Sequence, residues 1–286
     1  MRLGIFPNPE KQKVSSVLDS LLVFCEEEKI EAFLPKDIAI EKKCQRFDFK
    51  SEQSMKQLDA AISLGGDGTF LHMAQYVACF DIPVSGINMG RKGFLTEIEV
   101  ANMKKALVKI KAGQYEIEER SMLQSSLWRD GKKIREATAL NDVVLVKGNQ
   151  MRLIRLSVNI NGSKRDSYYS ADGIVFSTAT GSTAYSLSAG GPIVHPSLAV
   201  TIITPICPHA LSTRPLVVPA DNEIVIKPLK PYSEIILAND GLTLAEVIPG
   251  DTVKIKTSEQ KSKFIKLNKE SYYDTWQQRL QKGETV

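Results

Sequence analysis

The 286-residue sequence has little of what marks secreted, membrane-spanning or metal-binding proteins. Its four cysteines are far apart, so no pair has the spacing of a metal site or a redox motif. The three histidines also lack metal-ligand spacing, and we expect no protein metal site. No apolar run reaches membrane-spanning length, and the run at the start is too short for a signal peptide. We therefore expect a reduced, cytoplasmic protein that does not contact a membrane.

The positive and negative charges of the chain nearly balance. The net charge is only +4, which is too small to favour a nucleic-acid partner and is equally well explained by an anionic small ligand. The chain shows no internal repeat and no low-complexity segment. Its length and its 43% hydrophobic content suit a globular protein of one large or two ordinary domains.

The sequence contains neither the P-loop pattern nor G-x-G-x-x-G, but it has one conspicuous glycine turn. An apolar run over residues 60–64 stops at Gly65-Gly66-Asp67-Gly68-Thr69, and apolar residues then recur at helical spacing. This pattern predicts a strand, a turn and a helix. Glycines allow close approach of another molecule, and a helix start offers free N–H groups, so a phosphate fits there.

Asp67 is unexpected in a turn built only for phosphate. A carboxylate beside a phosphate has two sensible roles, which are to take a proton from a hydroxyl or to help hold Mg²⁺. The alternative is that Asp67 is only a turn residue or a helix cap, because Asp is common in both places.

The first part of the chain alternates between strand and helix patterns. This alternation predicts an α/β domain with a Rossmann-like parallel sheet, whose ligands bind at the carboxyl ends of the strands. Residues 36–57 are polar and ambiguous, and we expect a flexible loop there. The expected strands are residues 3–6, 32–34, 60–64 and 83–87, and the expected helices lie near residues 14–25, 69–77 and 101–111.

After about residue 115 short strands and turn residues dominate. The expected strands are residues 122–128, 134–139, 143–146, 153–160, 173–177, 200–205, 223–226, 235–238 and 253–256. Hairpin signals at 129–132 and at Asn161-Gly162 predict an all-β, sandwich-like domain. Residues 273–282 look helical but are too short and polar to stand alone, so we expect this helix to return to the first domain. The expected domains are 1–115 and 116–260, with 261–286 as a C-terminal segment packing on the first.

Three further stretches carry polar chemistry. The loop at residues 88–93 holds Arg91 and Lys92, which could face the same phosphates or lie on an ordinary exposed turn. Residues 177–191 are nearly all small or hydroxyl-bearing, and we expect them to line a polar ligand, with Tyr185 stacking on it; the alternative is a linker. Asn141-Asp142 offers hydrogen bonds to an adenine edge or a ribose, although such a pair is usually a turn.

Taken together, these stretches resemble the NAD kinases. The glycine turn alone is shared with lipid kinases and phosphofructokinases, but its combination with residues 180–185 and 188–192 is specific. The resemblance runs in order from the first strand to about residue 255. The matching stretches are residues 65–69, 86–90, 93–97, 141–142, 172–196, 209–212, 214–216 and 240–241.

The resemblance implies an enzyme that phosphorylates the 2′-hydroxyl of the adenosine ribose of NAD, giving NADP. It implies an α/β domain followed by a β-rich domain with NAD between them, and Mg²⁺ with ATP or polyphosphate as the donor. It also implies a homodimer or homotetramer in which a neighbouring subunit completes the site.

The same resemblance assigns roles to individual residues. Asp67 is the catalytic base and also contacts NAD, and Asp172 contacts the nicotinamide end. Asn141 and Asp142 contact the riboside parts of NAD. The remaining expected NAD contacts are Gly68, His72, Arg152, Thr180, Thr183, Ala184, Tyr185 and Ser188, and the expected phosphate contacts are Gly65, Gly66, Gly68 and Thr69.

Two other functions use some of the same features. A lipid or sphingoid-base kinase would share the glycine turn but needs an apolar acceptor pocket, and residues 177–191 favour a polar acceptor. A non-catalytic NADP sensor would not need Asp67 among the phosphates.

Overall fold

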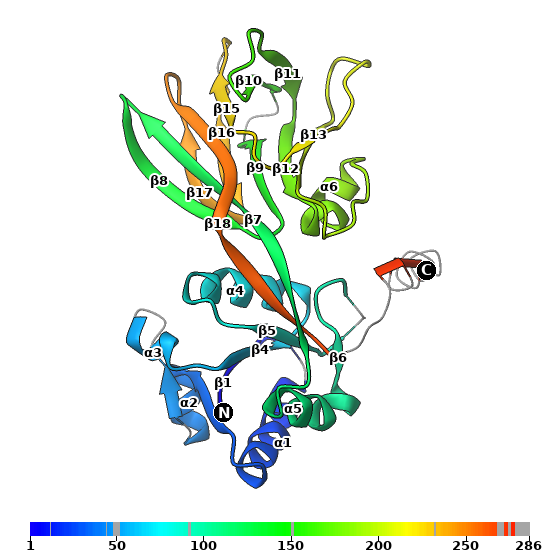
Figure 1. The fold of residues 1–286 in the computed structure, drawn as a ribbon. Helices are drawn as coiled ribbons and strands as arrows, with labels where there is room; N and C mark the ends of the chain where they lie inside the picture. Colours follow the sequence, from blue (N-terminus) through cyan, green and yellow to red (C-terminus); the bar gives the residue numbers. More distant parts are fainter. Residues whose placement is uncertain are drawn as a thin grey trace. The chain divides into compact units, whose positions relative to one another are not determined.

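The computed structural model describes all residues except 12, 44, 48–51, 91–92, 150–151, 232, 268–271, 274–275 and 278–286. The chain forms two compact units (Figure 1). One comprises Met1–Glu119 together with the segment that begins at Lys261, and the other comprises Arg120–Gln260. No helix among the described residues is long and apolar enough to cross a membrane.

The first unit is built on a parallel sheet. Its strand order is β18-β5-β4-β1-β2-β3, with the short strand β6 paired to β5. All of these neighbours run parallel, as the alternating strand and helix pattern predicted. The strands are β1 (Arg2–Pro7), β2 (Glu31–Pro35), β3 (Gln45–Phe47), β4 (Ala60–Gly65), β5 (Val84–Asn88), β6 (Ile98–Glu99) and the last residues of β18 (Thr252–Lys266).

Helices cover both faces of this sheet. One core joins Ile5 and Ile62 of the central strands to Leu21 of α1 and Leu107 of α5. Helix α4 lies on the opposite face (Figure 1) and buries Phe70. The sheet and its two helical layers confirm the predicted α/β fold. The helices are α1 (Val14–Glu27), α2 (Lys36–Lys42), α3 (Glu52–Lys56), α4 (Asp67–Val77) and α5 (Met103–Lys111), with 3₁₀ turns at Ala78–Phe80 and Val100–Asn102.

The prediction of a flexible loop over residues 36–57 was wrong. This stretch contains α2, β3 and α3. Helix α2 buries Ala39 and α3 buries Met55. Such short helices with one fully buried apolar side chain each produce no periodic hydrophobic pattern, so hydrophobic spacing does not reveal them.

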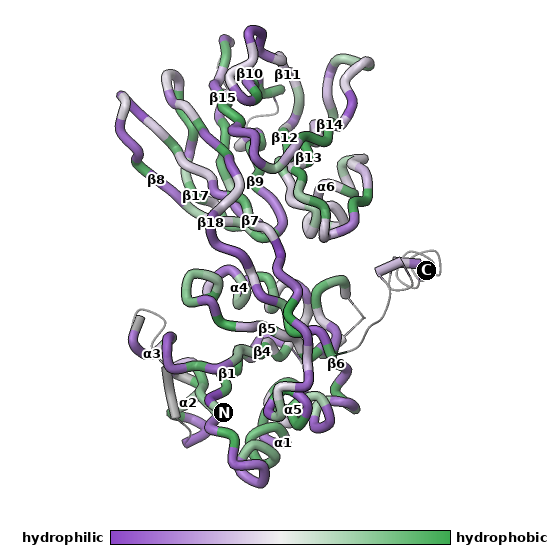
Figure 2. Tube along the Cα trace, in the orientation of Figure 1, coloured by the Kyte–Doolittle hydropathy of each residue, from purple (hydrophilic) through white to green (hydrophobic). Residues whose placement is uncertain are grey.

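The second unit is a sandwich of two antiparallel sheets. One sheet contains β11, β10, β15, β18, β7 and β8, and the other has the order β14-β13-β12-β9-β16-β17. A single core contains Leu156 and Ile226 from the first sheet and Leu145, Phe176 and Leu237 from the second. The tube in Figure 2 is hydrophobic along β9, β12 and β13 and hydrophilic at most hairpin tips. The predicted β-rich domain is therefore confirmed.

The strands of the sandwich are β7 (Glu116–Arg129), β8 (Lys132–Ala139), β9 (Asp142–Lys147), β10 (Ile154–Ile160), β11 (Ser167–Ala171), β12 (Gly173–Thr178), β13 (Val200–Ile206), β14 (Leu216–Pro219), β15 (Ile224–Pro228), β16 (Ile235–Asn239) and β17 (Leu242–Val247). A 3₁₀ turn, η3 (Thr180–Thr183), and the short helix α6 (Tyr185–Ser188) follow β12. The helix expected at residues 273–282 lies largely outside the described residues.

Two-residue turns set the register of two hairpins, β7–β8 and β16–β17. Asn161-Gly162, with φ values of 52° and 66°, begins the longer connection between β10 and β11 at residues 161–166, whereas Asp240-Gly241, with 47° and 81°, joins β16 directly to β17. The turn Asp130-Gly131, with 51° and 75°, is of the same kind. Positive φ at both central residues is the geometry that matches the twist of paired strands. Thus the hairpin turns at 130–131 and 161–162 are confirmed, while the one at 240–241 was not predicted.

Candidate functional site

In the first unit, the predicted glycine turn lies at the carboxyl end of β4. Gly66 is the N-cap of α4, and its carbonyl accepts the first helical hydrogen bond from the Phe70 N–H at 3.1 Å. The N–H groups before Phe70 have no partner within the helix, so they are available to an anion. A Cβ on Gly65 would lie 2.3 Å from Oγ1 of Thr69, so this position requires glycine. The Asn8 side chain donates to the same Thr69 oxygen at 3.3 Å.

The Asp67 carboxylate is held by a distant loop of the same unit. Oδ2 accepts the N–H of Phe94 at 2.5 Å, and Oδ1 accepts the N–H groups of Leu95 and Thr96 at 3.2 Å each. The Thr96 hydroxyl also donates to Oδ1 at 3.1 Å. A Cβ on Gly93 would lie 2.1 Å from Oδ1, so the loop backbone fits against the carboxylate only without a side chain there. Asp67 therefore has more than a local capping role.

The two oxygens of Asp67 are not equally engaged. A carboxylate offers about two acceptor positions on each oxygen. Oδ1 already accepts three hydrogen bonds, whereas Oδ2 accepts one. Oδ2 thus has room for one more donor, such as a hydroxyl group. Asp67 is partly exposed, so that donor has access from solvent.

The loop after β5 adjoins the glycine turn. The Met89 N–H donates to the Gly65 carbonyl at 2.7 Å, and the Asn88 side chain accepts the Gly90 N–H at 2.8 Å. The start of this loop and the glycine turn therefore lie together, as expected for adjacent parallel strand ends. The proposed roles of Arg91 and Lys92 concern residues outside those described. His72 is exposed on α4.

In the second unit, the Asn141-Asp142 turn packs against the end of β12. The Asn141 carbonyl accepts the Thr178 N–H at 2.9 Å and the Ser177 hydroxyl at 3.2 Å. The Thr178 hydroxyl donates to the Leu140 carbonyl at 2.7 Å. A Cβ on Gly181 would lie 2.2 Å from the Asn141 carbonyl oxygen. The structure thus brings two of the predicted polar stretches into direct contact.

The hydroxyl-rich run divides into an inner and an outer set. The Ser182 hydroxyl donates to the Ala179 carbonyl at 2.7 Å, and the Ser186 and Thr204 hydroxyls are 2.9 Å apart. The inner set is buried and consists of Ser177, Thr178, Thr180, Ser182 and Ser186. Our expectation that the run as a whole lines a ligand is therefore too broad, because these hydroxyls are packed inside the unit. The outer, partly or fully exposed set is Thr183, Ala184, Tyr185 and Ser188.

Thr180 belongs to the inner set, with 6% of its surface exposed. Its hydroxyl accepts a hydrogen bond from the buried Arg120 guanidinium at 3.3 Å. Asp172 lies between β11 and β12, where its carboxylate meets the Lys147 ammonium at 2.7 Å. The Lys147 N–H also donates to the Asp172 carbonyl at 2.9 Å, so β9 holds both the charge and the backbone of Asp172. Arg152 is exposed between β9 and β10.

Asp142 has an unusual electrostatic environment. It is 5% exposed, and burial followed by the nearby Asp240 raises the pKa of its carboxyl to about 7. Burial is also the main reason that the pKa of Tyr185 is raised, with smaller contributions from Asp142, Cys207 and Asp172. Asp142 is therefore only partly ionised near neutral pH, so it can both accept and donate hydrogen bonds.

Sequence reasoning assigned no role to Gly93, Lys147 or Asp240, although each contacts a predicted site residue. The signal for Asp240 was its Asp-Gly turn between two strands, which favours a tight hairpin. The signal for a role of Gly93 was its place directly after the cations Arg91 and Lys92 in the same loop. Lys147 gave no signal, because a lysine at a strand end is common.

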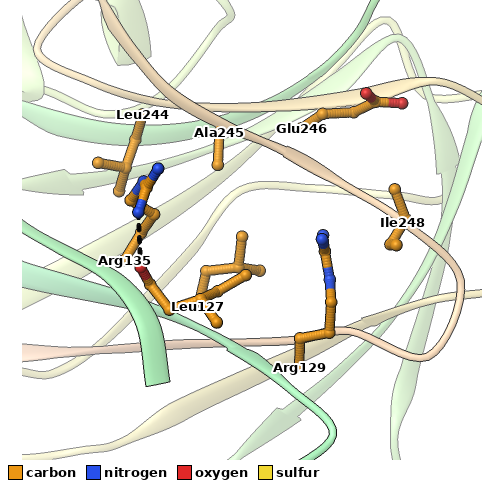
Figure 3. A pocket seen from close by; sticks show the side chains of 8 residues that line it. Leu127, Arg129, Arg135, Leu244, Ala245, Glu246 and Ile248 are labelled. Carbon is orange, nitrogen blue, oxygen red and sulfur yellow. Dashed lines mark hydrogen bonds between the residues drawn. The ribbon is translucent and has the colours of Figure 1, made fainter. Parts of the chain in front are cut away.

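A separate pocket of about 340 Å³ is lined by residues of β7 and β8 from the first sheet of the sandwich and of β17 from the second (Figure 3). Arg129 on its wall pairs with the buried Asp251, and the Arg135 guanidinium donates to the Ile134 carbonyl at 3.0 Å. None of the predicted site residues lines this pocket, so we do not assign the site to it. Its lining residues are Leu127, Arg129, Ile134, Arg135, Leu244, Ala245, Glu246 and Ile248.

Family models match both halves of the chain. The ATP-NAD kinase N-terminal domain matches residues 8–115, and the ATP-NAD kinase C-terminal domain matches residues 140–267. The NAD kinase of Moorella thermoacetica is 39% identical over 282 residues, which cover 99% of this chain and 90% of that protein. The NAD kinase of Heliobacterium modesticaldum is 44% identical over 229 residues, covering 80% of this chain and 81% of that protein.

Solved structures show the same fold. Yeast NADH kinase complexed with NADH matches with a TM-score of 0.90 and 24% identity, covering 100% of this chain and 89% of that one. An NAD kinase from Archaeoglobus fulgidus in complex with ATP matches with a TM-score of 0.72 and 26% identity, covering 94% and 95% of the two chains. Since both domain models match in order and relatives exceed 30% identity over almost the whole chain, this protein belongs to the NAD kinase family.

Proposed function

We propose that this protein transfers the γ-phosphoryl group of ATP to the 2′-hydroxyl of the adenosine ribose of NAD, giving NADP and ADP. Membership of the NAD kinase family supports the reaction, and the similar structure from Archaeoglobus fulgidus is described as a complex with ATP. The observation that carries the proposal is the Asp67 carboxylate, held at the start of α4 with room at Oδ2 for one further donor.

In this mechanism Asp67 acts as the general base. The 2′-hydroxyl donates to Oδ2, which takes the proton as the new oxygen–phosphorus bond forms and the bond from phosphorus to ADP breaks. Positioning is the main contribution of the protein, because phosphoryl transfer needs little covalent help. The hydrogen bonds from residues 94–96 supply it by limiting rotation of the carboxylate.

The start of α4 is the proposed phosphate site. The N–H groups of its first turn and the positive end of the helix dipole favour the donor phosphates, with Gly65, Gly66, Gly68 and Thr69 forming the turn. Mg²⁺ enters with ATP as part of the substrate, where it offsets the charge of the phosphates. Among the described residues no group of three His, Cys, Asp or Glu side chains is placed to hold a metal ion.

The proposed NAD contacts in the second unit are Asn141, Asp142 and Asp172, together with the outer set of the hydroxyl-rich run. Asn141 has both donors and an acceptor for an adenine edge, and Asp142 suits a ribose hydroxyl. Tyr185 is 42% exposed and offers a ring face for stacking. The exposed His72 and Arg152 keep their predicted contacts with NAD in this proposal, whereas the buried Thr180 is left out of it because its hydroxyl accepts from Arg120 inside the unit.

Further features of the proposal come from the sequence resemblance. We include a homodimer or homotetramer in which a neighbouring subunit completes the site, a cytoplasmic location, and polyphosphate as an alternative donor. Each is tested separately from the reaction, by the mass of the protein in solution, by cell fractionation and by replacing ATP with polyphosphate.

The deciding experiment is an acceptor competition. The purified protein is incubated with MgATP and equal amounts of NAD, NADH and a sphingoid base, and products are separated by chromatography. We expect NADP as the main product, confirmed with an NADP-specific dehydrogenase. A phosphorylated lipid as the main product would establish the lipid-kinase alternative. Tight binding of NADP without any turnover, with either ATP or polyphosphate, would establish the sensor alternative.

A further inference from the structure

Asp240 links two turns of the second unit through its side chain. Its Oδ2 accepts the Leu140 N–H at 2.7 Å, and its Oδ1 accepts the N–H groups of Asn141 and Asp142 at 2.8 and 2.9 Å. In return, the Asp240 N–H donates to the Asp142 carbonyl at 2.9 Å. Asp240 is only 7% exposed, so these bonds form away from solvent and are strong for that reason.

The opposite side of the same turn is also held. Carbonyl groups at positions 140 and 141 accept hydrogen bonds from Ser177 and Thr178 at the end of β12. The N–H groups at positions 140–142 are taken by Asp240. The backbone at Asn141 and Asp142 is therefore held on one side by the turn between β16 and β17 and on the other by the end of β12. This fixes the positions from which the two side chains extend.

A carboxylate is the only common side chain that suits this task at position 240. Three N–H groups converge on it, and a carboxylate presents two oxygens with no donor. An asparagine would offer one oxygen and turn an NH₂ group toward an N–H group. The carboxylate brings a second negative charge next to the buried Asp142, which a purely structural turn would avoid.

We propose that Asp240 is a positioning residue for NAD binding, which fixes the backbone at Asn141 and Asp142 and so sets the direction in which both side chains meet the dinucleotide. This inference rests on the proposed function, through the assignment of Asn141 and Asp142 to NAD. Asp240 itself is buried behind the turn and acts through these two residues.

The test compares Asp240→Asn with Asp251→Asn. Asp251 is a matched control because it is also a buried turn aspartate of the second unit, with its carboxylate bound to Arg129 and to the Ile248 N–H. It contacts none of the proposed NAD residues through these bonds. We expect Asp240→Asn to raise KM for NAD and the Kd for NAD from calorimetry by about tenfold, with KM for ATP unchanged. Asp251→Asn leaves all three constants unchanged.

A pH profile supplies a readout that lost packing alone would not move. Among the titratable groups near Asp142, Asp240 raises the pKa of its carboxyl, and Asp142 in turn contributes to the raised pKa of Tyr185. Removing the Asp240 charge shifts the midpoint of the pH dependence of NAD affinity to lower pH, because Asp142 then ionises more easily. Burial still keeps this midpoint above the ordinary pKa of an aspartate.

The outcomes separate the positioning role from the proposed function. An unchanged Kd and pH profile in Asp240→Asn, or an equal rise in Kd in Asp251→Asn, overturns the positioning role. If the wild type binds NAD without turnover, the kinase activity is wrong and the Kd values still decide the role of Asp240. Amide hydrogen exchange at positions 140–142 provides the structural check, and we expect it to be faster in Asp240→Asn only.

Discussion

Two aspartates, one in each unit, organise the backbone in the same way. Asp67 accepts the N–H groups of residues 94–96, and Asp240 accepts those of residues 140–142. Both carboxylates thus hold three consecutive peptide groups that are distant in sequence. They differ in exposure, since Asp67 is partly exposed and Asp240 is buried.

This difference in exposure separates two kinds of function. The Asp67 carboxylate keeps an acceptor position on Oδ2 and reaches solvent, so it can meet a substrate hydroxyl while the loop holds it. The Asp240 carboxylate has no such access and acts on Asn141 and Asp142. A carboxylate that holds backbone N–H groups can therefore also react with a substrate when it is partly exposed, whereas a buried one only positions its neighbours.

The first prediction disturbs the Asp67 arrangement without touching its carboxylate. In Gly93→Ala, the new Cβ would lie 2.1 to 2.3 Å from the carboxylate atoms and would displace them. We expect kcat to fall about 10- to 100-fold, since small misplacements of reacting groups have effects of this size. Steady-state rates of NADP formation measure it.

Gly90→Ala is the control for this experiment. A Cβ at Gly90 meets no heavy atom within 4 Å, and the substitution lies in the same loop. We expect its kcat to equal that of the wild type. Equal rates for Gly93→Ala and the wild type would show that the close fit against Asp67 does not matter for catalysis.

The second prediction concerns the charge of Asp142. Its pKa is raised from 3.8 to about 7, so the folded protein binds a proton that the unfolded chain has lost between these two pH values. Stability therefore falls as pH rises from about 4 to about 7, by up to about 4 kcal/mol. Asp142→Asn removes this loss, so its free energy of unfolding exceeds that of the wild type at pH 8 and is close to it at pH 4.

The same substitution is expected to weaken NAD binding by about tenfold, because one acceptor for a ribose hydroxyl is lost. Denaturant unfolding at both pH values and calorimetric titration with NAD measure the two effects. A stability difference that stays constant with pH would contradict the raised pKa of Asp142.

The third prediction has the smallest effect on catalysis. The Asp251 side chain is fully buried, and the pKa of its carboxyl is lowered because the hydrogen bond from Arg129 and the Ile248 N–H outweigh the effect of burial. Asp251→Ala removes the acceptor of the Ile248 N–H as well as the partner of the half-exposed Arg129, and the lost backbone hydrogen bond is expected to reduce the free energy of unfolding by about 1 kcal/mol. We expect KM and kcat at 25 °C to stay at wild-type values.

The pH dependence of this variant has the opposite sign to that of Asp142. A lowered pKa stabilises the fold above the pKa of the unfolded chain, and this stabilisation is lost as pH falls through the folded value. The difference in stability between the wild type and Asp251→Ala is therefore expected to shrink at acid pH. Unfolding midpoints at pH 7 and pH 3 test this, and a difference that grows at pH 3 would contradict it.

Local patterns were sufficient to predict most of the fold. The α/β unit and the two hairpin turns follow from hydrophobic spacing and from turn residues, both of which are short-range signals. Strands β11, β14 and β17 were missed because most of their residues are partly or fully exposed, so they carry little hydrophobic alternation. Helices α2 and α3 were missed because they are short and bury few apolar side chains.

The sequence led to predictions of which residues form the site, but not of their contacts. The family resemblance implied that Asp67 is the base, but the contact of Asp67 with Phe94 spans 27 residues and depends on how two strand ends meet. The contact of Asp240 with Leu140 spans 100 residues and depends on strand pairing in the sandwich. The composition of residues 177–191 does not distinguish buried from exposed hydroxyl groups, because serine and threonine occur in both the inner and the outer set.

The role of Asp67 is tested most directly by Asp67→Asn in a single-turnover experiment. Enzyme saturated with NAD is mixed with MgATP, NADP formation is followed over time, and NAD affinity is measured separately by calorimetry. We predict a rate at least about 10³-fold below that of the wild type with unchanged NAD affinity, since the amide keeps the shape but cannot take the proton. NADP formation at a rate close to that of the wild type would contradict the assignment of Asp67 as the base.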